Sequence, residues 1–484
     1  MRLAHSCQGL AFGSGAAFNG STLAASKEVV VVSINYRLGV LGFTAFAEDL
    51  SGARSSGTGN WGLQDQQSAL RWVQRHAHVF GGDKSRVMIF GQSAGASSVH
   101  KHLVMPSSRG LFASALMESG STHSWPLSFS LAKTAKLAAH FNCSSPPASP
   151  SSSFSSSSSS STSSLKTCLR AQSVAGLLAY QGDSPIPAVN DEQALPTDDG
   201  VLFPRSPLAL TRDGLMADVP LLLGSNTNDS TLFVQGYPLF TTMNTSTEYM
   251  HILNRTLSVD GHAAIPAGST AAATLARLKA IYPPREDAEE NAHQFALYQT
   301  DAGFACPTRA VARGAAAAAD AGRRRSPVFL YRYNHPWAQR SCYDLFFDAS
   351  FGTTHTAEVS YVFGRPIYLF GPPSPCATNG SCALDPTERN FSDVISTLWT
   401  SFAAGGPPRA QGWTWPAFTS ARGNNVVLDA SNMPHVPTQR GARGGAAATA
   451  AAVAGKTGEA GKDLFEEEFF LRKLQCDYWD EQNP

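Results

Sequence analysis

The sequence has few charged residues and no excess of either sign. Only 15% of its 484 residues are charged, and 37 basic side chains balance 37 acidic ones. Proteins that bind nucleic acid or anionic membranes carry a basic excess, so neither is an expected partner. No apolar run is long enough to span a bilayer, and no Cys or His cluster has zinc spacing. We therefore expect no transmembrane segment, no metal and no cofactor.

Residues 1–8 also lack the apolar core of a signal peptide. Two other features are nevertheless typical of secreted proteins: the chain has 8 cysteines, and it contains many N-x-S/T glycosylation sequons. A chain rich in serine and threonine also acquires sequons by chance. We expect a protein of the secretory pathway whose N-terminal end is incomplete in this sequence. The sequons begin at Asn19, Asn142, Asn228, Asn244, Asn254, Asn379 and Asn390.

Apolar runs alternate with helical patterns along much of the chain, and 43% of the residues are hydrophobic, enough for a large core. The β-branched run at 28–35 is typical of a strand buried on both faces of a parallel sheet. A helix is expected over 64–80, ended by the glycines at 81–82. This alternation predicts βαβ units and a mostly parallel sheet flanked by helices. Further strands are expected at 87–90, 112–117, 220–224 and 327–332.

Two stretches have low complexity. Residues 144–164 are nearly all serine with some proline, and residues 441–461 are rich in alanine and glycine. Neither can bury much apolar surface, so we expect flexible insertions within one domain spanning residues 1–484. Residues 463–479 have the pattern of an amphipathic helix.

Residues 87–99 have the pattern of a nucleophile elbow. A short apolar run leads into the motif G-Q-S-A-G at 91–95, and a helical pattern begins at Ala94. Glycines at both ends of the motif permit a very tight turn. Such a turn exposes the Ser93 hydroxyl at a helix N-terminus, where developing negative charge is favoured. The motif also fits an ordinary Gly/Ser turn, so its interpretation depends on the rest of the sequence.

Several motifs, in order, resemble the carboxylesterase type B family, which includes the cholinesterases. The resemblance extends from about Gly9 to Trp479, interrupted by the two low-complexity stretches. It implies an α/β-hydrolase fold with a mostly parallel central sheet, and the family's N-terminal strands are apparently missing here. The motifs stand at residues 35–39, 42–43, 59–66, 69–73, 80–83 and 91–95.

The same resemblance implies a general base and an acid for Ser93. Residues 352–364 resemble the family's histidine loop, which makes His355 the expected base. Residues 223–233 resemble the loop that carries the family's acid, usually glutamate, and Asp229 occupies that position. A serine hydroxyl requires such a base, and the base requires an orienting acid.

Asp198 and Asp199 are competing candidates for the acid. The stretch at 196–200, however, resembles a structural turn of the family. The chain order Ser93, Asp229, His355 is also the order expected for an α/β-hydrolase triad.

The expected oxyanion hole departs from the family pattern. The backbone N–H of Ala94 is one expected donor. The family supplies others from a glycine run, but residues 6–15 retain only Gly9 in the corresponding place, with Gln8 beside it. Losing one donor typically costs about 10²–10³ in rate. Either the first residues derive from a wrong start, which we favour, or the protein is catalytically impaired.

The resemblance implies two disulfides, Cys143–Cys168 and Cys306–Cys476. The second would tie the C-terminal helix to the body of the protein. Cys376 and Cys382 are spaced for a small local loop, whereas Cys7 and Cys342 have no assigned partner.

Three further residues bear on the site. Gln92 stands where many relatives carry glutamate, and a neutral side chain there argues against a cationic choline ester. Trp125 is a candidate for the acyl pocket, although a core tryptophan explains its presence equally well. Glu358 resembles a buried supporting carboxylate rather than a catalytic one.

Together these features predict a serine carboxylic-ester hydrolase that acts through an acyl-enzyme on uncharged small-molecule esters. Two alternatives remain open. One is a catalytically impaired, cholinesterase-like binding or adhesion protein, which the altered glycine run favours. The other is a truncated gene model of the esterase, whose missing strands would leave an exposed sheet edge.

Overall fold

A computed structural model describes most of the chain. Residues 144–161, the predicted insertion at 441–461 and residues 463–474 lie outside the described part. Residues 475–478 are helical. Residues 162–164, expected in the serine-rich insertion, instead begin helix α6 (Thr162–Arg170). The described residues are 2–5, 15, 18–50, 57–120, 122–143, 162–181, 195–235, 243–259, 270–336, 351–365, 384, 386–432 and 475–478.

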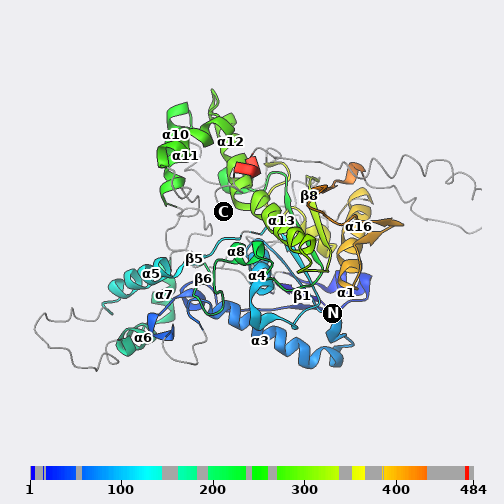
Figure 1. Cartoon of the computed structure of the whole chain (residues 1–484), viewed down its shortest axis with the longest axis horizontal. Coiled ribbons are helices and arrows are strands. Elements are labelled where there is room, and N and C mark those ends of the chain that lie inside the picture. The colour runs from blue at the N-terminus through cyan, green and yellow to red at the C-terminus, as the bar shows by residue number, and fades with distance from the viewer. Residues whose placement is uncertain are drawn as a thin grey trace, which may run out of the picture.

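The core of the molecule is a 7-stranded sheet with the order β11-β8-β7-β4-β3-β1-β2. Every neighbouring pair in it is parallel, which confirms the predicted mostly parallel sheet (Figure 1). Parallel neighbours require crossover connections, and helices supply them. The strands are β1 (Arg2–His5), β2 (Val31–Ser33), β3 (Met88–Gln92), β4 (Ser114–Glu118), β7 (Leu221–Asn226), β8 (Val328–Tyr333) and β11 (Val426–Leu428).

The N-terminal side of the sheet differs from expectation. The strand predicted at 28–35 is shorter, Val31–Ser33, and its residues are half-buried or exposed rather than buried on both faces. The reason is its place at the edge: within the described part of the chain β2 pairs with β1 alone. The strand β1, which the sequence pattern did not predict, lies between β2 and β3.

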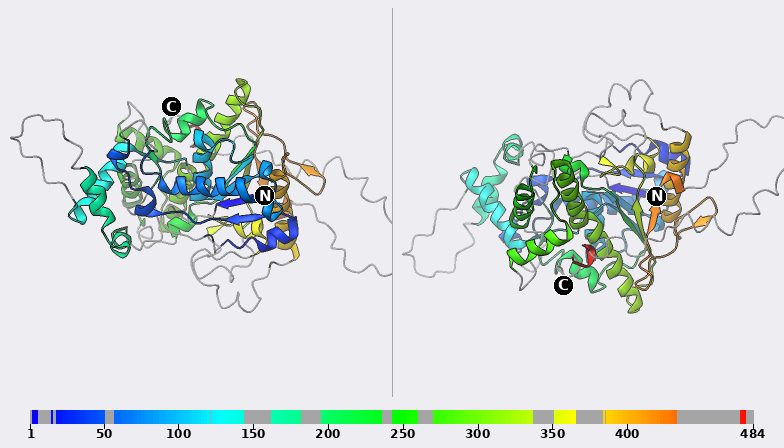
Figure 2. Two further views of the ribbon diagram at one scale, coloured as in Figure 1. Left: turned by 90° about the horizontal axis from the view of Figure 1, so that it is seen from below. Right: turned by 90° about the horizontal axis from the view of Figure 1, so that it is seen from above.

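Helices cover both faces of the sheet, as Figures 1 and 2 show. Alternate strand residues point to opposite faces, so Ile89 belongs to one apolar cluster whereas Met88 and Phe90 belong to the other. The first cluster includes residues of α3 (Trp61–His76), α4 (Ala94–Val104), α8 (Pro207–Arg212) and α13 (Cys306–Asp320). The second includes residues of α14 (Val359–Phe363) and α16 (Pro386–Ala403), against which α1 (Ser21–Lys27) packs.

The predicted helix at 64–80 is confirmed in outline. It consists of α3 and a 3₁₀ turn, Ala77–Phe80, and ends where Gly81 adopts a left-handed conformation with φ of 72°. The shorter elements are α2 (Gly39–Phe43), α9 (Thr231–Gln235), β5 (Trp125–Pro126), β6 (Thr197–Asp198), β9 (Arg409–Ala410), β10 (Trp413–Thr414) and the 3₁₀ turns Ala47–Leu50, Lys84–Arg86, Pro106–Ser108 and Ala430–Asn432.

Two groups of helices lie outside the main layers, and each contains a disulfide. Cys143–Cys168 lies among α5 (Leu127–His140), α6 and α7 (Val174–Gln181). Cys306–Cys476 belongs to the cluster formed by α10 (Ser246–Val259), α11 (Ala271–Ile281) and α12 (Ala288–Thr300). Both bonds join the pairs that the family resemblance implied.

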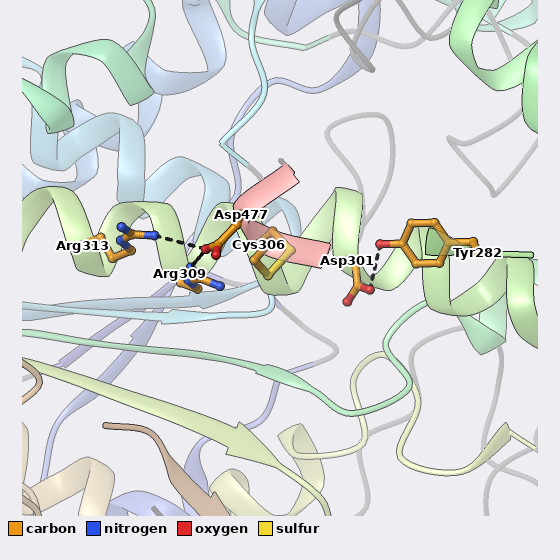
Figure 3. Close-up of a disulfide and its surroundings, with 7 residues drawn as sticks. Tyr282, Asp301, Cys306, Arg309, Arg313 and Asp477 are labelled. Atoms are coloured by element: carbon orange, nitrogen blue, oxygen red, sulfur yellow. Dashed lines mark hydrogen bonds and ion pairs between the residues drawn. A yellow bond between two sulfur atoms is a disulfide. The ribbon is translucent and has the colours of Figure 1, made fainter. Parts of the chain in front are cut away.

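The second disulfide fastens the C-terminal segment to the start of α13 (Figure 3). Beside it, the Asp477 carboxylate forms ion pairs with Arg309 and Arg313 of the same helix. One turn earlier in the chain, a π-helix, Asp301–Ala305, connects α12 to α13. The disulfide and the ion pairs of Asp477 fix the start of α13 in place. They therefore also restrain the π-helix that precedes it.

The close packing of β7 against β8 generates a test of the fold. Gly224 pairs with Tyr331, and an added Cβ at Gly224 would lie 2.3 Å from the tyrosine ring. We expect Gly224→Ala to lower the free energy of unfolding by about 1–3 kcal/mol, because the buried ring must shift. Gly406→Ala is the matched control, since a Cβ there meets nothing within 4 Å. Chemical denaturation measures both, and equal stability of the two variants would contradict the packing.

Candidate active site

Ser93 lies at the turn between β3 and α4, at the edge of the sheet where the parallel strands have their carboxyl ends. Its φ of 59° and ψ of −123° are unfavourable for a side chain with a Cβ. Its N–H donates to the carbonyl of Glu118 at 2.8 Å, and its carbonyl accepts from Ser97 N at 2.9 Å. The facing chain approaches closely here, since a Cβ on Gly120 would lie 2.7 Å from that of Ala96. The turn is therefore held in a strained geometry by its neighbours on both sides.

His355 and Asp229 meet at the same edge of the sheet. The distance from His355 Nδ1 to Asp229 Oδ1 is 2.8 Å, and the side chains are only 4% and 0% exposed. The other Asp229 oxygen accepts the backbone N–H of Asn226, at the end of β7, at 2.7 Å. This second bond fixes the orientation of the carboxylate toward the imidazole.

Hydrogen bonds join the loops that carry these two residues. Asn228 N donates to the carbonyl of Thr353 at 3.0 Å, and Thr353 N donates back to Asn228 Oδ1 at 3.2 Å. The Thr231 and Thr354 hydroxyls are 2.9 Å apart. Because both loops follow adjacent parallel strands, their pairing places the imidazole next to the carboxylate.

The outer nitrogen of the imidazole contacts the residue before Ser93. Gln92 Nε2 lies 3.1 Å from His355 Nε2, and Gln92 is only 8% exposed. Within the described residues the structure records no hydrogen bond between the Ser93 hydroxyl and His355. Gln92 therefore connects the nucleophile elbow to the imidazole of His355.

Two phenylalanines, neither singled out from the sequence, contact the imidazole, and their rings stack on each other with centroids 6.1 Å apart. The ring centroids of Phe233 and Phe304 lie 5.0 and 4.8 Å from that of His355. Phe233 stands one helical turn after Asp229, a spacing that could have indicated it. Phe304 belongs to the π-helix Asp301–Ala305, and no local signal connects that segment to the site.

Two buried glutamates lie beneath the site. Glu358 is fully buried and accepts a hydrogen bond from Asn226 Nδ2 at 2.6 Å. Glu118 is 2% exposed and accepts one from Trp399 Nε1 at 3.0 Å. Burial raises the pKa of Glu358 well above its ordinary value and that of Glu118 to about 8. Both side chains are therefore favoured in their neutral form at neutral pH.

The candidates for the oxyanion hole and the acyl pocket lie in different parts of the chain. Ala94 is the first residue of α4, whereas Gly9 and Gln8 lie outside the described residues. Trp125 is buried in β5, where its ring contacts Phe129 edge-on. Its place in an acyl pocket remains a prediction.

The two competing aspartates belong to β6 and the turn that follows it. The Asp199 carboxylate accepts backbone N–H groups of Thr58 and of residues 201–203, which is the structural turn that the resemblance implied. Burial raises the pKa of Asp198, while a hydrogen bond to Ser124 and the charge of the buried Lys101 of α4 oppose this shift; no imidazole from the described part of the chain is among the groups that act on it.

Several cysteines and one sequon cannot be assessed, because they lie outside the described residues: Cys7, Cys342, Cys376, Cys382 and Asn379. Among the described residues, no three His, Cys, Asp or Glu side chains are grouped as metal ligands would be. None of the described helices combines the length and the apolar character that crossing a bilayer requires.

The raised pKa of Glu118 makes stability depend on pH. Between its ordinary pKa of 4.5 and about 8, the folded state binds more protons here than the unfolded state, so stability falls as pH rises through this window. We expect Glu118→Gln, which keeps an acceptor for Trp399, to be more stable than the wild type at pH 9 by on the order of 2–4 kcal/mol. The exposed Glu286→Gln is the control. Urea denaturation from pH 5 to 9 measures both, and parallel profiles for wild type and Glu118→Gln would contradict this reading.

Known proteins provide an independent comparison. Residues 6–443 match the model of the carboxylesterase family. The chain is 27% identical to the acetylcholinesterase of Bungarus fasciatus over 448 residues, covering 89% of this chain and 66% of that protein. It is 30% identical to the acylcarnitine hydrolase of Mus musculus over 412 residues, covering 84% of this chain and 64% of the other.

The chain is also similar to a protein whose name does not state an esterase or hydrolase activity. Neuroligin-3 of Mus musculus is 30% identical over 399 residues, covering 82% of this chain and 43% of that protein. The chain thus spans less than two thirds of the length of each of these relatives. The family match nevertheless includes nearly all of the sheet, its helices and the candidate site. The chain belongs to the carboxylesterase family and has its α/β-hydrolase fold.

Proposed function

We propose that the protein is a serine carboxylic-ester hydrolase in which Ser93 is the nucleophile, His355 the general base and Asp229 its orienting acid. The observation that carries this proposal is the buried Asp229–His355 contact of 2.8 Å beside the strained elbow of Ser93. A carboxylate on Nδ1 favours the tautomer whose Nε2 can accept a proton, which a serine nucleophile requires. Membership of the carboxylesterase family supports the same chemistry.

In this mechanism His355 Nε2 takes the hydroxyl proton as Ser93 Oγ bonds to the ester carbonyl carbon. The tetrahedral intermediate collapses, the bond to the alcohol oxygen breaks, and His355 gives its proton to the departing alcohol. Water then attacks the acyl-enzyme with His355 again as base, which releases the acid and restores Ser93. Asp229 stabilises the imidazolium at both stages. The N–H groups of Ala94 and Gly9 are the proposed donors to the oxyanion.

The proposed substrates are uncharged esters. Within the described residues, the polar side chain in recorded contact with the imidazole besides Asp229 is the neutral carboxamide of Gln92. The glutamates beneath the site, Glu118 and Glu358, have raised pKa values and so provide little negative charge at neutral pH. The rings of Phe233 and Phe304 add apolar surface beside the base. Phenylalanine faces attract cations weakly, but apart from Asp229, which is paired with His355, no ionised carboxylate in this set attracts a cationic alcohol group.

A second candidate function is that of a cholinesterase-like binding or adhesion protein. The similarity to neuroligin-3 favours it, as does the altered glycine run at residues 6–15. The two functions differ in whether Ser93 reacts.

We expect Ser93→Ala to lower hydrolysis of a short-chain aryl ester by at least about 10³-fold, because no nucleophile remains. His355→Gln should lose activity similarly, whereas the exposed His251→Gln should keep it. An organophosphate should label wild-type Ser93 covalently, as peptide mass spectrometry would show. Turnover by Ser93→Ala at the wild-type rate would refute the esterase. A folded wild type that neither turns over nor reacts would favour the binding protein.

We also propose that the protein is secreted and glycosylated. Two disulfides are typical of an oxidising compartment. The sequon residues Asn19, Asn142 and Asn244 are exposed, as an acceptor must be. Asn228 differs, since its side-chain oxygen accepts a hydrogen bond from Thr353 in the loop beside Asp229.

Expression in a secretory cell line tests this proposal. We expect glycans at Asn19, Asn142 and Asn244 and an unmodified Asn228, measured by mass spectrometry of peptides after enzymatic deglycosylation. The triple Asn→Gln variant at the first three positions should migrate faster than the wild type on a denaturing gel. Identical migration before and after deglycosylation of the wild type would contradict the proposal.

A further inference from the structure

The contact between Gln92 and His355 defines the protonation state of the resting base. The Asp229 carboxylate accepts at Nδ1, so in the neutral ring Nε2 carries the lone pair and accepts from the Gln92 N–H 3.1 Å away. The ring proton then lies on Nδ1 and is donated to Asp229 Oδ1, 2.8 Å away. The two contacts require the same neutral tautomer. The side chain of Gln92 thus occupies the lone pair to which, in the proposed mechanism, Ser93 gives its proton.

The backbone of Gln92 leaves its side chain little choice of position. Gln92 is the last residue of β3, in register with Glu118 of β4, and it is 8% exposed. The terminal torsion of a carboxamide is nevertheless broad, so the group can turn over in place. After a half-turn its oxygen, rather than its nitrogen, faces the imidazole.

We propose that Gln92 is a positioning residue for the general base and serves both of its protonation states. In the resting protein the Gln92 N–H holds Nε2 of the neutral ring, and the Ser93 hydroxyl displaces it when substrate binds. Once the ring has become an imidazolium, the Gln92 oxygen can accept Nε2–H until the proton passes to the leaving alcohol. This inference rests on the proposed function, because it assigns a role around the same base.

A carboxylate at position 92 would act differently. It could only accept, so it would stabilise the imidazolium and offer nothing to the neutral ring. The other ionisable groups around His355 would remain as they are: Asp229 on Nδ1, Glu358 on the following helix, Glu118 behind the elbow, Tyr331 on β8 and Asp301 at the start of the π-helix that carries Phe304. A change at residue 92 alone therefore reports on this contact.

The experiment compares Gln92→Glu with Gln92→Met, which removes the amide at similar volume. We expect the acidic limb of the kcat/KM profile to move upward by about one pH unit in Gln92→Glu. In Gln92→Met the limb should not move upward, and the plateau should fall by about tenfold, because the imidazolium loses the Gln92 oxygen as its acceptor at Nε2. The control is Gln411→Glu, in the exposed turn between β9 and β10, which should match the wild type in both respects.

A second readout does not depend on turnover. Imidazole ¹⁵N shifts of histidine-labelled protein, with His355 identified by His355→Gln, should show the Nδ1–H tautomer in the wild type at high pH. In Gln92→Glu the ring should gain its second proton about one pH unit higher.

The two readouts separate failure of this inference from failure of the esterase. If the wild type hydrolyses esters but neither the rate profile nor the ¹⁵N titration moves in Gln92→Glu, the role of Gln92 is overturned and the esterase stands. If the titration moves but Ser93 proves unreactive, the contact of Gln92 with His355 is supported and the proposed reaction fails. A neutral wild-type ring protonated on Nε2 alone would overturn the proposed donation from Gln92 to Nε2 directly.

Discussion

The hydrogen bond between Asp229 and His355 is the interaction around which the candidate site is arranged. It joins residues 126 positions apart in the chain, each in a loop that follows one of two adjacent parallel strands. The bond is short and fully buried, and water cannot compete for either partner. Its geometry depends on the register of β7 with β8, and hence on Gly224, which has no Cβ and so leaves room for the ring of Tyr331.

The residues around Asp229 and His355 carry less charge at neutral pH than their side-chain types suggest. Glu118 and Glu358 lie close to the site, but burial disfavours their charged forms. The His355 ring contacts two phenylalanines, and its Nε2 contacts the Gln92 amide. The imidazole is thus held at both ring nitrogens and by one pair of stacked phenylalanines, and among the described residues the charge of Asp229 is the one recorded in contact with it. This is the physical basis for proposing uncharged esters as substrates.

The structure also explains why elements far from the sheet matter to the site. Phe304 reaches His355 from a π-helix, and the next residues along the chain are the first turn of α13, where Cys306 is bonded to Cys476. The C-terminal segment therefore supports the helix that precedes α13, from which Phe304 contacts the base. Such a connection between a remote disulfide and the site is a property of the tertiary arrangement.

Much of this could be predicted from local sequence. The elbow at Ser93, the helix that ends at Gly81 and the strands β4, β7 and β8 follow from apolar periodicity and turn chemistry, which act over a few residues. The family resemblance added the positions of His355 and Asp229 and both disulfide pairs. The edge position of β2, the strand β1, the approach of Phe304 and the contact of Gln92 with the imidazole were decided only by the tertiary structure. Each of these depends on which distant segment becomes a neighbour, and pairing across a sheet leaves no trace in the spacing of residues along one strand.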